Sequence, residues 1–378
     1  MRLTLLLLTS ISCLFAWQQS PADQRIAAAR QQVNTNGKAF QVYNDLATAL
    51  CRKARDTSDV ALYDEASAAV DHSLAISPGN YDALKLRVAV LLGKHEFTQA
   101  LKLAQELNKK VPDDIGMWAM LTDANAALGN YTEAERDAQW VLDLRRGSAL
   151  GFEKAAGLRE LFGDNEGAIE FYGEALSRTA QSDLDQRAWL LTQKARLTLA
   201  SGNAKEASGI LADALRFFPG SQAAALVMAD IQAANGNYAE AAGLFEKCYI
   251  AVPSAANLYK WATALDQAGQ KDKANEQFAA FEKKARAEIS KPYNANLELI
   301  AYYTDRKSDP AEALRIATLE SANRQDCHTL AALAWALYQN GKYADAKTQM
   351  DKALSVGTRE PVYLSHASRI SSSLGGSK

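Results

Sequence analysis

Small, large and turn-forming residues recur along the chain at nearly fixed spacing. Nine alanines mark the repeat, at successive steps of 34, 34, 34, 39, 34, 33, 39 and 33 residues: Ala66, Ala100, Ala134, Ala168, Ala207, Ala241, Ala274, Ala313 and Ala346. Twelve residues before each marker stands a small or slim residue, and sixteen before it a large apolar residue in eight of nine cases. Two helices cross closely where both present small side chains, so each unit predicts one helix pair. A period near 34 residues is typical of stacked helical solenoids.

Glycine and proline mark the ends of the predicted helices. Five residues before the marker, six units carry glycine: Gly129, Gly163, Gly202, Gly236, Gly269 and Gly341. We expect these glycines to adopt a positive φ, which ends the first helix of the unit in a tight turn. Twelve residues after the marker, four units carry a proline that stops the second helix: Pro78, Pro112, Pro219 and Pro253.

Two steps of 39 residues interrupt the period. The first extra segment falls near Gln181–Arg187, and the second follows Phe281 as a predicted helix that continues until Pro292 stops it. Each is a candidate joint between two sub-stacks. The predicted organisation is an export signal (1–16), an N-terminal capping-helix region (17–43), units one to four (44–180), units five to nine (181–358), and a C-terminal cap helix with a disordered tail (359–378).

The first sixteen residues have the pattern of a secretory signal peptide. Arg2 precedes a short apolar run that ends at Ala16, and this run is too short to span a membrane. We expect cleavage after Ala16 and export to the periplasm or the medium. A lipid anchor at Cys13 is the alternative. The sequence favours cleavage without lipidation, because Ser10 stands where a lipoprotein motif prefers leucine.

Composition is that of an ordered helical protein without a basic surface. The chain is 48% hydrophobic and 23% charged, and its net charge of -2 argues against a nucleic-acid scaffold. Beyond the signal peptide, Cys51, Cys248 and Cys327 are odd in number and lie in distant units, so they do not predict a disulfide framework. Cys248 stands where other units carry alanine, and we expect it to be a buried small residue.

The segments Trp118–Ala134 and Leu330–Ala346 resemble tetratricopeptide repeats. The resemblance covers roughly residues 44–360. It implies an all-α, right-handed solenoid of about nine helix pairs with capping helices, in which the first helices line the concave surface. The order of the units, with the segment Arg159–Glu170, also resembles a group of bacterial secreted or envelope proteins built from this repeat. That group implies no particular biochemical role.

No pattern of catalytic or metal-binding residues stands out in the sequence. His72, His95, His328 and His366 lie far apart, and none has a partner at metal-ligand spacing. The chain carries neither a nucleophile elbow nor a glycine-rich phosphate loop. We therefore expect no catalytic residues, no metal and no cofactor.

By the resemblance, residues fifteen, eleven and eight positions before each marker line the concave surface. The position eleven before gives Arg55, Ala89, Asp123, Gly157, Arg196, Asp230, Thr263, Tyr302 and Trp335. It never carries asparagine, which argues against the carboxylate clamp of chaperone-binding members. The last three units gather aromatic residues on this face: Tyr259, Tyr302, Trp335 and Tyr338. Such residues commonly anchor recognition surfaces, and the alternative is that they pack against neighbouring helices.

The sequence thus predicts a non-enzymatic scaffold that binds a peptide or helix of a protein partner in the concave groove. The candidate binding residues are Tyr259, Tyr302, Trp335 and Tyr338, with Arg196 and Asp230 tuning the charge further along. No nucleic-acid partner and no membrane span are expected. An accessory or sensor subunit that binds a small ligand or a glycan is the alternative, since aromatic rings suit sugar faces as well as peptides.

Overall fold

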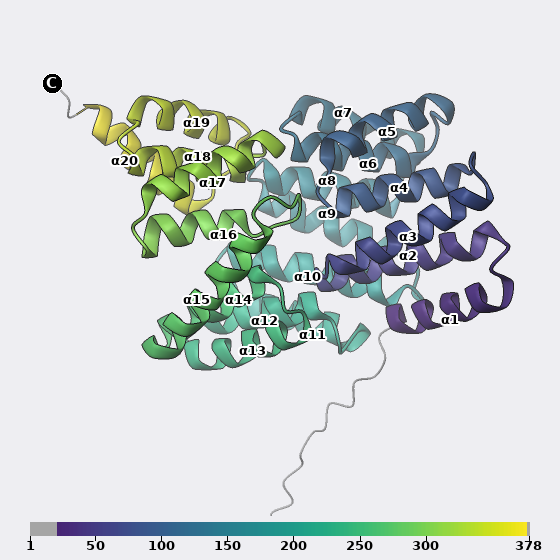
Figure 1. The fold of residues 1–378 in the computed structure, drawn as a ribbon, viewed down its shortest axis with the longest axis horizontal. Helices are drawn as coiled ribbons and strands as arrows, with labels where there is room; N and C mark the ends of the chain where they lie inside the picture. Colours follow the sequence, from purple (N-terminus) through teal and green to yellow (C-terminus); the bar gives the residue numbers. More distant parts are fainter. Residues whose placement is uncertain (1–20, 376–378) are drawn as a thin grey trace, which may run out of the picture.

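A computed structural model describes residues 21–375, so the predicted signal peptide, with Cys13 and Ala16, lies outside the described residues. The described chain is helical throughout and contains no strand (Figure 1). Its first ten helices are α1 (Pro21–Asn36), α2 (Phe40–Thr57), α3 (Ala61–Ile76), α4 (Tyr81–Gly93), α5 (Phe97–Lys110), α6 (Ile115–Ala127), α7 (Tyr131–Leu144), α8 (Ala149–Leu161), α9 (Asn165–Arg178) and α10 (Leu184–Ala200). The others are α11 (Ala204–Phe217), α12 (Gln222–Ala234), α13 (Tyr238–Ala251), α14 (Ala255–Gln267), α15 (Lys271–Glu288), α16 (Asn296–Ala301), the π-helical turn η1 (Tyr302–Arg306), α17 (Pro310–Asn323), α18 (Cys327–Gln339), α19 (Tyr343–Ser355) and α20 (Pro361–Gly375).

Consecutive helices pack as pairs, and the small residues of the repeat lie where they cross. All nine marker alanines are fully buried. Eight of the nine residues twelve positions before them are buried as well, and Ala301 is half-buried. The predicted helix pairs and their crossing points are therefore confirmed. Cys248 is buried, as expected, and all three cysteines of the described chain are free thiols.

The turn residues act as the sequence predicts. The six repeat glycines have φ between 72° and 87°. The helices α3, α5, α11 and α13 end two residues before Pro78, Pro112, Pro219 and Pro253. Several first helices begin at a polar residue whose side chain accepts a backbone N–H, which satisfies an otherwise unpaired donor: Asn80, Asp114, Ser221, Ser254 and Asp326.

Both extra segments lengthen helices without interrupting the core. The first lengthens α10, which has 17 residues and begins at Leu184. The second lengthens α15, but this helix ends at Glu288, so the expected end at Pro292 is wrong. Just beyond the helix, the Ile289 carbonyl accepts a hydrogen bond from the Asn296 side chain at 3.1 Å. Phe281 of α15 and Leu299 of α16 belong to one buried cluster, so the core continues through this point.

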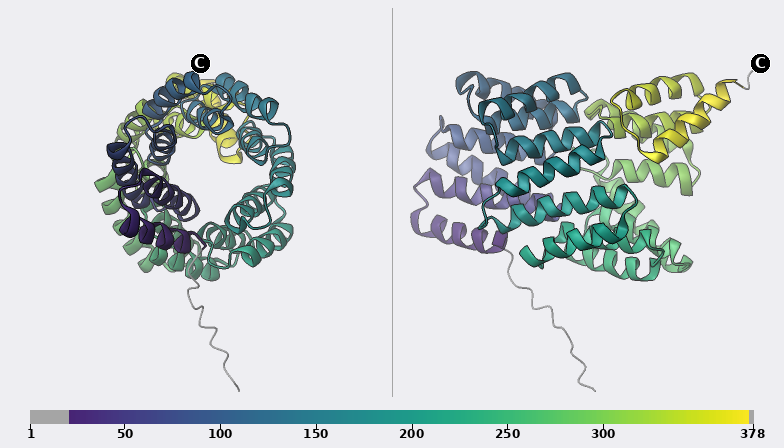
Figure 2. Two further views of the ribbon diagram at one scale, coloured as in Figure 1. Left: turned by 90° about the vertical axis from the view of Figure 1, so that its right-hand side faces the viewer. Right: turned by 180° about the vertical axis from the view of Figure 1, so that it is seen from behind.

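The stack coils through more than one superhelical turn (Figure 2). Helices α1 and α2 lie beside α10 and α12, where Arg25 pairs with Asp185 at 2.6 Å and Arg52 pairs with Asp183 at 3.2 Å. We call this contact the N-terminal seam. Further along, a Cβ atom added at Gly163 would lie 2.6 Å from the Gly357 carbonyl oxygen. Units distant in sequence thus lie against one another.

Candidate functional site

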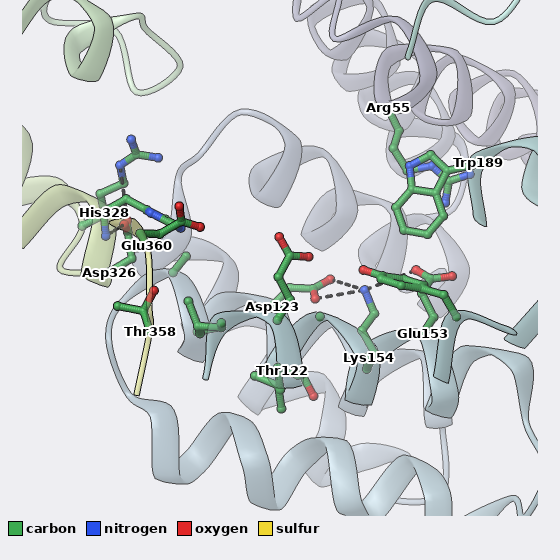
Figure 3. Close-up of a pocket in the computed structure, with 18 of the residues that line it drawn as sticks. Arg55, Thr122, Asp123, Glu153, Lys154, Trp189, Asp326, His328, Thr358 and Glu360 are labelled. Atoms are coloured by element: carbon green, nitrogen blue, oxygen red, sulfur yellow. Dashed lines mark hydrogen bonds and ion pairs between the residues drawn. The ribbon is translucent and has the colours of Figure 1, made fainter. Parts of the chain in front are cut away.

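A cavity of about 530 Å³ lies on the inner wall, where three parts of the chain meet (Figure 3). Its wall comes from α6, α8 and α10. Helix α2 of the N-terminal seam contributes Arg55, and α16 contributes Leu297. The segments that precede α18 and α20 contribute the opposite side, with Asp326 and Glu360 among their residues. Volumes of roughly 300–1,000 Å³ are usual for ligand-binding pockets.

The lining follows the concave positions that the resemblance implies. Arg55, Asp123 and Gly157 stand eleven residues before a marker alanine and all line the cavity. Glu153 stands fifteen before Ala168 and lines it as well. The repeat register therefore brings charged residues and one glycine to a common inner surface.

A lysine–carboxylate pair lies at the centre of the cavity. Lys154 Nζ donates to Asp123 Oδ2 at 2.7 Å and to Oδ1 at 2.9 Å, and lies 3.7 Å from Glu153 Oε1. Desolvation raises the pKa of Asp123, and the Lys154 charge offsets part of this effect. Desolvation also opposes the charged form of Lys154, but the Asp123 and Glu153 carboxylates outweigh it, so the pKa of Lys154 is raised. The carboxylates thus hold Lys154 in its charged form.

The N-terminal seam joins the wall through Arg55. The Arg55 guanidinium lies 5.0 Å from the ring centroid of Trp189 and donates to Gln186 Oε1 at 2.8 Å. The Gln186 amide in turn donates to Glu153 Oε2 at 2.7 Å. The Trp189 ring lies edge-on to Tyr172, with centroids 6.0 Å apart. This chain of contacts connects the position of α2 to the shape of the cavity.

The opposite side is formed by the second superhelical turn. Asp326 accepts the backbone N–H groups of His328 and Thr329, each at 3.0 Å, and so begins α18. Thr358 is 7% exposed and lines the cavity beside the exposed Glu360. Packing between distant units, and not the repeat itself, places these residues at the site.

Two of the predicted aromatic anchors are buried. Tyr302 is 8% exposed, and its ring stacks on Phe278 with centroids 5.7 Å apart. Trp335 is 6% exposed, and its ring stacks on His366 at a centroid distance of 3.7 Å. The Trp335 indole N–H donates to Asp305 at 3.0 Å. Both side chains therefore pack against neighbouring helices, which was the alternative to a binding role. Their role in partner binding stays a prediction.

The other predicted residues fall at different places. Tyr259 is half-buried against Phe281, and Tyr338 is half-buried against Trp335, with ring centroids 4.9 Å apart in both pairs. Arg196 donates to Glu160 Oε2 at 2.6 Å and so adjoins the cavity. Asp230 pairs with Lys260 at 3.0 Å, away from the cavity lining. The structure brings only Arg196 of the predicted set to the cavity.

Sequence reasoning named neither Lys154 nor Trp189 nor Glu360 as part of a site. Glu153 stands at a concave position of the repeat, so the repeat register predicts that it faces the inner surface. Trp189 lies on α10, the helix lengthened by the first extra segment, and Glu360 lies between α19 and α20. Among residues 21–375, no group of three or more His, Cys, Asp and Glu side chains could hold a metal ion, and no helix is long and apolar enough to cross a membrane.

The fold and its inner cavity define an α-solenoid of repeated helix pairs. Two family models described as "Tetratricopeptide repeat" match residues 192–256 and 327–360. The two matched segments are therefore tetratricopeptide repeats, and the helix-pair architecture of the described chain is that of this repeat. Proteins with this fold are generally protein-interaction scaffolds and typically not enzymes.

Solved structures share the architecture at low sequence identity. The APC/C hetero-tetramer Cut9–Hcn1 is 15% identical with a TM-score of 0.56, and the match covers 91% of this chain and 58% of that one. The human IFIT1 dimer with PPP-AAAA is 12% identical with a TM-score of 0.52, and covers 89% of this chain and 95% of that one. These similarities show the fold alone. No curated protein sequence matches the chain significantly.

Proposed function

We propose that the protein is a non-enzymatic interaction scaffold that holds a peptide segment of a protein partner in the cavity on its inner wall. The observation that carries this proposal is the cavity itself, at the concave positions of units three to five. Charged groups and the ring of Trp189 meet there, a combination that provides both polar and apolar contacts for a peptide.

A glycine in the wall offers a direct test. Gly157 is exposed on the inner face of α8, and a Cβ atom there would meet only Tyr172 Oη, at 4.0 Å. A tryptophan at this position would project into the cavity without displacing the core. Gly209 on α11 is also exposed, and a Cβ atom there meets nothing within 4 Å, so it provides the matched control.

The experiment compares wild type, Gly157→Trp and Gly209→Trp as baits in envelope and secreted extracts. We expect wild type and Gly209→Trp to capture the same partner, and Gly157→Trp to lose it while keeping its circular dichroism spectrum. Equal capture by a folded Gly157→Trp variant would place the partner elsewhere. Tyr338→Ala, a half-buried position, tests the C-terminal aromatic face in the same assay.

We also propose that the protein acts in the periplasm or outside the cell. The support is the signal-peptide pattern of residues 1–16. Mass determination of the exported protein should give a chain that begins at Trp17. A chain that keeps Met1, or that carries lipid on Cys13, would contradict this proposal.

A further inference from the structure

The cations that line the cavity already have carboxylate partners. Lys154 is paired with Asp123, as described above. Arg55 Nε lies 3.6 Å from Asp56 Oδ1. Arg324 Nε lies 2.8 Å from Glu320 Oε1. Each of the three cations therefore has a carboxylate oxygen of the protein within 3.6 Å.

The carboxylates of the cavity outnumber these cations. Glu160 forms an ion pair with Arg196. The nearest cation to Glu153 is Lys154, which lies closer to Asp123. The Glu360 side chain lines the cavity and forms no ion pair or hydrogen bond with any described residue. Lys154 is thus shared between two carboxylates, and Glu360 acts on the charge of Arg196, which already pairs with Glu160. Carboxylates therefore remain in excess of cations along the lining.

The arrangement of the carboxylates favours the binding of positively charged groups in the cavity. Figure 3 shows Glu360 and Glu153 on two sides of the cavity, with Asp123 between them. At the centre, Asp123 is held in an ion pair with Lys154. Thr358 is nine-tenths buried beside Glu360, and its hydroxyl bonds to no described residue. Clefts lined by one sign of charge between low-dielectric walls concentrate ligands of the opposite charge.

We infer that the peptide held in the cavity is basic, and that its lysine or arginine side chains pair with Glu153 and Glu360. This inference rests on the proposed function. Specificity then has two sources. The carboxylates of the cavity repel an acidic segment, and they form ion pairs with the side chains of a basic segment.

A random heptapeptide phage library displayed against the full-length mature protein tests the inference. Clones that bind wild type and fail to bind Gly157→Trp are sequenced. We expect lysine and arginine to be enriched among them. If no clone distinguishes the two baits, the proposed function itself fails. If clones distinguish them but acidic or uncharged sequences prevail, the cavity binds peptides and the inference of a basic ligand is wrong.

The selected peptide is then synthesised and titrated against a Glu153→Gln/Glu360→Gln variant. We expect binding at least about tenfold weaker, since two charge pairs are lost. The matched control, Glu133→Gln/Glu135→Gln, changes two exposed carboxylates on α7 and should bind as wild type does. Equal affinity for the wild type and the Glu153/Glu360 variant would overturn the assignment of these two carboxylates.

Discussion

Arg25 of α1 donates a hydrogen bond to Asp185 of α10 at 2.6 Å, across 160 residues of sequence. Asp185 is 2% exposed, so this is an ion pair with one buried partner. With Arg52–Asp183, it fastens the start of the chain to the middle of the stack. Because the adjacent Arg55 lines the cavity, the same seam also fixes one wall of the proposed binding site.

The first prediction concerns this seam. An Arg25→Ala/Arg52→Ala variant leaves the buried Asp185 without its partner, and we expect the docking of α1–α3 to weaken by about 1–3 kcal/mol. The measurement is hydrogen exchange, which should speed up in α1–α3 and at the start of α10. Arg216→Ala, which removes a local pair on α11, should leave those amides unchanged. Unchanged exchange in the double variant would mean that the pairs do not hold the seam.

The second prediction is a pH dependence at Asp56. The pKa of Asp56 is raised to about 6, chiefly by burial and also by Asp185, although Arg55 and Arg52 oppose the shift. Tyr63 of α3 also faces this group. Because the pKa in the folded state lies above the ordinary aspartate value of 3.8, protonation favours the folded state. That stabilisation is complete below pH ~4 and is lost as the pH rises through about 6.

Asp56→Asn removes this dependence. The free energy of unfolding is measured with urea at pH 7.5 and 4.5. On going from pH 7.5 to pH 4.5, wild type should gain about 2 kcal/mol relative to the Asp56→Asn variant. The comparison of the two proteins cancels the opposite contribution of His95, whose pKa burial lowers to about 4. Identical pH profiles of the two proteins would contradict the prediction.

The third prediction compares two turn glycines that the repeat makes equivalent. Gly163 has φ 77° and Gly236 has φ 79°, so alanine is strained at both, by about 1 kcal/mol. Only at Gly163 would the new Cβ atom meet another unit, 2.6 Å from the Gly357 oxygen, whereas Gly236 faces open space. We expect Gly163→Ala to cost at least about 1 kcal/mol more in urea unfolding. Equal losses would show that the superhelical turns do not touch there.

These two glycines also show which features of the fold the sequence predicts and which it does not. Each unit's helices, crossing points and turns depend on local residues such as Ala168 and Gly163, so the repeat period predicts them. The stacking of one superhelical turn on another depends on small rotations that add up over many units, and no residue pattern encodes that sum locally. Gly163 and Gly236 look alike in sequence, and only the coil gives them different neighbours. For the same reason the register predicts Asp123 and Gly157 at the inner wall, whereas Glu360 joins the cavity without any sequence signal.

The fourth prediction concerns the buried aromatic residues. Trp335→Ala removes a ring packed between His366 of α20 and Tyr338, and we expect a loss of about 3–5 kcal/mol in the stability of the C-terminal units. Hydrogen exchange should speed up in α20. Trp335→Phe keeps part of the packing and should lose less. If Trp335→Ala keeps wild-type stability and loses only partner binding, the residue is a binding anchor and not a packing residue.

The central claim is that the inner cavity holds the partner, and site-specific photo-crosslinking tests it most directly. A benzoylphenylalanine side chain is placed at His328, an exposed aromatic residue of the cavity lining, or at Gly209, which is exposed on α11, and the partner-bound protein is irradiated. We predict crosslinks from position 328 to one peptide segment of the partner, and none from position 209. Crosslinks from position 209 alone, with the partner still bound to both variants, would contradict the account.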